Sequence, residues 1–83
     1  MKKRPNEADL AWDLVDDHRD ALTQAERDMA FVNLGVGEYT IVIRDVLGAV
    51  LRERQSLSAE HAGKVEAWVG FYSLHNEFSA LFN

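Results

Sequence analysis

The chain has 83 residues, no cysteine and a formal net charge of −5 at pH 7, which leaves room for a single domain. The lack of cysteine excludes a disulfide framework, a thiolate nucleophile and a zinc–thiolate site. The acidic balance disfavours binding to a phosphate backbone, because the basic residues from Arg19 to Lys64 are scattered rather than clustered.

A monomer of this length has a small net free energy of folding. Size scaling gives about 130 kcal/mol of hydrophobic stabilisation for a folded monomer. Ordering the chain costs about 125 kcal/mol. Because the two quantities nearly cancel, we expect a second copy or a partner protein to stabilise the fold.

The first five residues predict a flexible basic tail. Acidic residues follow this tail, instead of the apolar run of a signal peptide. No stretch approaches the roughly 18 consecutive apolar residues of a membrane span. We therefore expect a cytoplasmic protein that does not enter a membrane.

The first helix is predicted over residues 7–20. Asn6 can cap it, and Glu7 and Asp9 occupy the first turn, where the helix dipole favours negative charge. A second helix is predicted over 23–34, because Thr23 and Glu26 have the spacing of a capping box. Gly35 is expected to take a positive φ at its end and to begin a tight turn through Gly37.

A third helix is predicted over residues 38–55. Its apolar residues share one arc of a helical wheel: Tyr39, Val42, Ile43, Val46, Leu47, Ala49 and Val50. The β-branched run from Tyr39 to Arg44 leaves open the alternative of an intermolecular strand. No second strand candidate exists to pair with it within the chain, so helix is favoured.

The turn before the third helix locally resembles a tetratricopeptide unit. Gly37, Glu38, Tyr39 and Ile43 are similar to the turn and the start of the second helix of such a repeat, over some eleven residues. A solenoid needs about three repeats, and the remaining signature positions are not matched. We therefore expect a generic helical hairpin here.

The last helix is predicted over residues 58–82, with Ser58 as its cap. One apolar seam recurs at alternating spacings of four and three: Ala67, Phe71, Leu74, Phe78 and Leu81. A second stripe has the same rhythm one residue later: Val65, Trp68, Tyr72, His75 and Ser79. A helix that is apolar around so much of its surface must be covered on more than one side, which predicts an oligomer built on this helix.

Residues that could carry chemistry are few. Asp9, Asp13, Asp16, Asp17 and Asp20 with His18 suggest a metal site, but neither the Glu-x-x-His spacing nor a calcium loop is present. No serine elbow and no glycine-rich phosphate loop occurs. We expect no catalytic residue, no metal and no cofactor.

The sequence therefore predicts a single all-α domain, residues 1–83, that forms a small four-helix array and a homo-oligomer, most simply a dimer. We expect a non-enzymatic protein-interaction module, such as an adaptor, assembly factor or small inhibitor, with a further protein as its target. The predicted interface residues are Val65, Trp68, Val69, Tyr72, His75 and Phe82. The alternative is a dimeric DNA-binding regulator of the ribbon-helix-helix or helix-turn-helix type, although Arg44 alone offers little positive charge to a groove.

Overall fold

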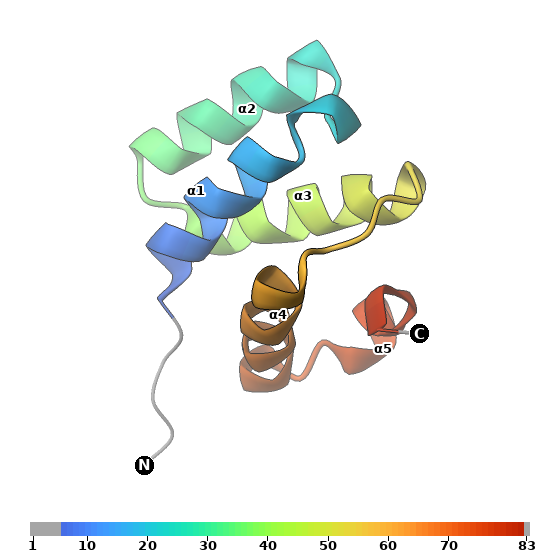
Figure 1. Cartoon of the computed structure of the whole chain (residues 1–83). Helices are drawn as coiled ribbons and strands as arrows, with labels where there is room; N and C mark the ends of the chain where they lie inside the picture. The colour runs from blue at the N-terminus through green and yellow to red at the C-terminus, as the bar shows by residue number, and fades with distance from the viewer. Residues whose placement is uncertain (1–5, 83) are drawn as a thin grey trace.

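The computed structural model describes residues 6–82, and every element in that range is helical (Figure 1). The predicted all-helical class is confirmed, but the number of helices is five rather than four. The predicted flexible tail, residues 1–5, lies outside the described residues. The helices are α1 (Glu7–Asp17), α2 (Gln24–Gly35), α3 (Tyr39–Arg52), α4 (Ala59–Tyr72) and α5 (His75–Phe78). Short 3-10 turns follow α1 at Arg19–Ala21 and α5 at Ser79–Phe82.

The third helix is the centre of the fold. In Figure 1, α2 and α3 run antiparallel as a hairpin, and α1 lies against both of them. Helix α4 packs on α1 and leads to α5 through a short turn. The apolar arc of α3 is buried apart from the half-buried Tyr39, with Val42, Ile43, Val46, Leu47 and Val50 inaccessible to solvent. The other helices therefore pack against this apolar face of α3.

Three helices begin at the capping residues that the sequence predicts. The Asn6 side chain accepts a hydrogen bond from the Asp9 amide at 3.2 Å, and the Ser58 hydroxyl accepts one from the His61 amide at 3.1 Å. Thr23 and Glu26 form a reciprocal capping box, with bonds of 3.1 and 2.8 Å. Each contact satisfies an amide that has no partner within its own helix, which sets the start of the helix.

The turn between α2 and α3 differs from the prediction in one residue. Gly35 is the last residue of α2, and the positive φ of +79° falls at Gly37 instead. The Glu38 amide donates to the Asn33 carbonyl at 2.9 Å, and the Gly37 amide donates to the Leu34 carbonyl at 3.2 Å. These bonds close the end of α2, so the left-handed residue is the one that follows its C-cap.

The β-branched run at residues 39–44 is helical, and residues 6–82 contain no strand. Burial of Val42 and Ile43 against the other helices outweighs the β propensity of the run. The intermolecular strand that a ribbon-helix-helix dimer needs is thus replaced by the first turns of α3. Helix α3 ends at Arg52 rather than at Gln55.

The prediction of one continuous helix over residues 58–82 is wrong. Helix α4 ends at Tyr72, and Ser73 adopts a left-handed conformation with φ +57°. The Leu74 amide then donates to the Val69 carbonyl at 2.9 Å, which turns the chain back toward α4. Phe78 of α5 thereby reaches Trp68, with ring centroids 6.2 Å apart. The apolar residues of α4 are therefore covered partly by α1 and partly by the return of α5, whereas Phe82 stays exposed.

A carboxylate at the start of α1 joins three helices. Glu7 is buried, and its Oε2 accepts hydrogen bonds from the Thr40 hydroxyl at 2.7 Å and from the Trp68 indole N–H at 3.1 Å. Its Oε1 accepts a bond from the Tyr72 hydroxyl at 2.9 Å. All three donors lie on helices other than α1. This carboxylate therefore fixes how α4 lies relative to α1 and α3.

We expect Glu7→Ala to lower the free energy of unfolding by roughly 2–4 kcal/mol, because it leaves the buried Trp68 N–H without its acceptor. Urea denaturation measures this. Glu60→Ala is the matched control, because Glu60 also lies in the first turn of a helix but is exposed. Equal losses in the two variants would contradict the role given to Glu7.

An ion pair at the other end of the hairpin joins the start of α2 to the end of α3. Arg52 donates to both carboxylate oxygens of Glu26 at 2.8 and 2.9 Å, and to the Ala21 carbonyl. Hydrogen bonds from Arg52 and from the Thr23 amide lower the pKa of Glu26 from 4.5 to about 2. A carboxyl group whose pKa is depressed by folding stabilises the folded state above its unfolded pKa.

The stabilisation by Glu26 is therefore expected to be complete above pH 4.5 and to disappear as the pH falls toward 2. The measurement is the difference in unfolding free energy between the wild-type chain and Glu26→Gln, at several pH values from 7 to about 2.5. The glutamine variant serves as the reference that lacks a titrating group at this position. A difference that stays constant over this range would contradict the assignment.

Candidate protein-contact surface

Four of the six predicted interface residues lie inside the chain or partly inside it. Val65, Trp68 and Val69 are 0% exposed, so they offer no surface to a partner. Tyr72 is partly buried, and its hydroxyl is bound to Glu7. Trp68 packs between two rings, with the Tyr72 centroid at 5.4 Å and the Phe78 centroid at 6.2 Å.

The other two predicted residues reach the surface together. His75 and Phe82 are exposed and line a shallow hollow of about 250 Å³ with Glu66 and Ser79. His75 lies over Gly70, where its ring is 3.8 Å from the position that a Cβ atom would take. These two residues of the predicted interface remain exposed, but the surface that they offer is small.

We expect Trp68→Phe to lower the unfolding free energy by about 1–3 kcal/mol, because it removes the indole N–H from a buried carboxylate. The mass in solution should not change. Trp12→Phe is the matched control, since Trp12 is exposed, and it should change stability by less than about 0.5 kcal/mol. A loss of self-association on Trp68→Phe without loss of stability would contradict the core assignment.

The acidic cluster of α1 is divided among separate contacts. Asp16 pairs with Arg19 at 3.4 Å, and His18 is buried with its Nδ1 2.8 Å from the Gln55 side-chain oxygen. Asp17 lies 2.8 Å from Nδ1 of the buried His61, close enough for an ion pair but not aligned as a hydrogen bond. Within residues 6–82 no group of three such side chains is arranged to hold a metal ion.

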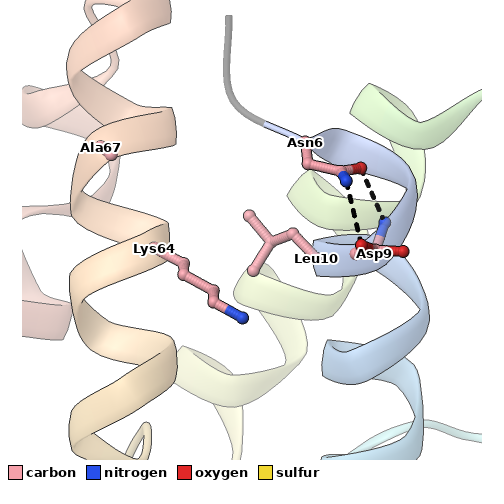
Figure 2. Close-up of a pocket in the computed structure, with 5 residues that line it drawn as sticks. All are labelled: Asn6, Asp9, Leu10, Lys64 and Ala67. Carbon is pink, nitrogen blue, oxygen red and sulfur yellow. Dashed lines mark hydrogen bonds between the residues drawn. The ribbon is translucent and has the colours of Figure 1, made fainter.

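A cavity of about 300 Å³ lies between the start of α1 and α4 (Figure 2). Leu10 and Ala67 line it together with Asn6, Asp9 and Lys64. Asn6 and Asp9 are bonded to each other at 2.9 and 3.2 Å, and Lys64 lies 3.4 Å from Glu60. The polar groups around this cavity are thus already engaged, and they do not converge on one point, as a ligand-binding site requires.

The main exposed apolar surface lies on α2, whereas the interface predicted from the sequence lies on the last helix. Met29, Val32 and Val36 are 56%, 60% and 68% exposed. Together with Ala25 they recur at spacings of four, three and four, so they form one stripe along α2. We call these four residues the α2 stripe. The spacing was visible in the sequence, but it did not show which face of α2 packs inward.

A second apolar area lies on the other side of α2. Phe31 and Trp12 of α1 are both exposed by 40% or more, and their ring centroids are 6.3 Å apart. The guanidinium carbon of Arg19 lies 5.8 Å from the Phe31 ring centre, a cation–π contact. Partly exposed tryptophan and arginine side chains are the types most enriched at binding hot spots.

A groove of about 500 Å³ runs between α2 and α3 beside the α2 stripe. Ala25 and Met29 form one wall, and Asp45, Gly48 and Ala49 are on the other. Glu26, Arg44 and Arg52 border it, and Arg44 is paired with Glu77 at 2.9 Å. Four of the eight residues that line the groove are charged, and the other four are small or apolar.

Asp45 is the charged residue of this groove that has no hydrogen bond or ion pair with another residue of the 6–82 range. Partial burial and the nearby Glu26 carboxylate raise the pKa of Asp45. The positive charge of Arg44 partly offsets this rise in the pKa of Asp45.

No protein-family profile, no curated protein and no solved structure matches the chain. Within residues 6–82, none of the helices combines the length and apolar character needed to cross a membrane.

Proposed function

We propose that the chain is a non-enzymatic protein-interaction module whose main contact surface is α2, and that it acts in the cytoplasm as an adaptor, assembly factor or small inhibitor. The observation that carries the proposal is the concentration of exposed apolar side chains on this helix. Of the seven large hydrophobic residues exposed in residues 6–82, Met29, Phe31, Val32 and Val36 lie on α2 or at its C-cap, and Trp12 adjoins Phe31.

This concentration needs an explanation, because the chain buries its other apolar residues efficiently. Eighteen hydrophobic residues of the described range form one buried core. Isolated apolar side chains are normal on a protein surface, whereas a continuous group such as Met29, Val32 and Val36 marks a contact site, and Phe31 with Trp12 forms a separate, smaller group. The contact therefore lies on α2, away from the α4 residues that the sequence favoured.

The acidic character of the chain is expected to select the partner. The formal net charge is −5, so association with a basic protein surface gains in rate and specificity. The DNA-binding alternative gains no support, because Arg44 and Arg52 are both engaged by carboxylates of the chain.

Val32→Lys tests the proposal. The side chain is exposed and lies near the end of α2, where a cation suits the helix dipole, so the fold should be retained. Pull-down with the full-length chain from native lysate is expected to lose its partner by more than about tenfold with this variant. The matched control is Asn76→Lys, which adds the same charge at an exposed position of α5. Identical sets of bound proteins for wild type and Val32→Lys would refute the proposal.

A further inference from the structure

The segment that follows α4 is joined to it through a residue in a left-handed conformation (Figure 1). Ser73 has φ +57° and ψ +43°, and its exposed side chain makes no hydrogen bond within residues 6–82. A residue that carries a Cβ atom is strained in this conformation, because the Cβ atom crowds the following carbonyl oxygen. Ser73 is therefore a short, strained hinge between α4 and α5.

The sequence on both sides of Ser73 favours a helix that continues through it. The apolar seam of the last segment keeps its spacing of four and three across the hinge: Ala67, Phe71, Leu74, Phe78 and Leu81. Neither glycine nor proline, the two residues that most disfavour a helix, occurs after Gly70. The left-handed turn therefore depends on the contacts that α5 makes with the rest of the molecule.

The turn at the end of α3 has the same conformation but a different sequence context. Arg54 is the other residue of the 6–82 range, glycine apart, that has a positive φ, at +54°. The apolar spacing of α3 does not continue beyond it, and the Gln55 side chain is bound to the buried His18 at 2.8 Å. Local preference and observed conformation thus disagree at Ser73 and agree at Arg54.

The side chains of α5 are held by contacts with α3 and α4. Phe78 is 2% exposed, and its ring centroid lies 6.2 Å from that of Trp68. Arg44 Nη2 donates to both carboxylate oxygens of Glu77, at 2.9 and 3.1 Å. Neither contact involves the hinge, so the α5 segment of another copy of the chain has the side chains needed to make both.

We propose that two copies of this chain exchange their C-terminal segments, residues 74–82. In the exchanged dimer Ser73 is helical, α4 continues into α5, and α5 of each copy packs on α3 and α4 of the other. Exchange of an identical element keeps its contacts, and a short hinge under strain favours it. This inference goes beyond the proposed function, because it does not involve α2.

The geometry of a straight helix requires that the exchanged contacts form between copies. Trp68 and Phe78 are ten residues apart, which is about 15 Å along the axis of a continuous helix. Their rings can then meet only when Phe78 comes from the partner subunit. Glu77 moves away from its own Arg44 in the same way, so the ion pair also forms between the two copies.

The hinge is tested by the mass of the full-length chain in solution, measured by sedimentation after refolding from urea at about 0.5 mM. The wild type is expected to contain dimer. Ser73→Gly should weaken this dimer by at least about tenfold, because glycine relieves the left-handed turn of the monomer and disfavours the helical hinge of the dimer. Arg54→Gly is the matched control, since it relieves the same strain at a turn that monomer and dimer share.

The exchange itself is tested with two charge-reversal variants, Arg44→Glu and Glu77→Arg. Both side chains are about half exposed, so each variant should fold, which circular dichroism checks. Refolded together in equal amounts, the two variants are expected to form a heterodimer. Each position 44 then faces a position 77 of opposite charge, whereas like charges meet in either variant alone.

The control mixture contains Lys64→Glu and Glu60→Lys, which reverse an exposed ion pair within α4. This pair stays within one copy after exchange, so the mixture should show no preference for a heterodimer.

Three results would each overturn the inference. These are a wild-type chain that is monomeric after refolding at about 0.5 mM, a dimer that Ser73→Gly leaves unchanged, and a mixture of the Arg44 and Glu77 variants without heterodimer. A dimer that Val32→Lys disrupts and Ser73→Gly does not would overturn the exchange and leave the proposed contact surface on α2 in place.

Discussion

The structure depends on one buried carboxylate. Glu7 accepts hydrogen bonds from Thr40, Trp68 and Tyr72, which are 33, 61 and 65 residues away along the chain. A buried carboxyl group is tolerated when hydrogen-bond donors replace the water that it loses. Because these donors come from α3 and α4, they reach Glu7 together only when both helices are in place around α1. It thus selects one arrangement among the many that apolar contacts alone would allow.

The position of the proposed contact surface follows from how the apolar residues of the last segment are buried. The left-handed turn at Ser73 brings Phe78 back against Trp68, so one chain covers the aromatic residues of α4. With α4 covered, the exposed apolar area that remains lies mainly on α2. The proposed contact is therefore assigned to α2 and not to α4.

The sequence predicted the local features well and the long-range ones poorly. Asn6, Thr23 and Ser58 marked the helix starts because capping is decided within a few residues. The buried arc of α3 followed from its periodicity. The break at Ser73 was missed because the apolar spacing continues through it. Glu7 was assigned to the helix dipole, since its partners lie far away in the sequence. The α2 stripe was visible as a spacing, but which of two apolar faces packs inward depends on the other helices.

The two indole rings of this chain occupy opposite surroundings. Trp12 lies in water beside Phe31 at the edge of the proposed contact surface, whereas Trp68 is sealed in the core with its N–H on a carboxylate. Their fluorescence should therefore separate by wavelength, with the buried ring emitting to the blue of the exposed one. Trp12 fluorescence can therefore report on binding of another molecule, and Trp68 fluorescence can report on unfolding.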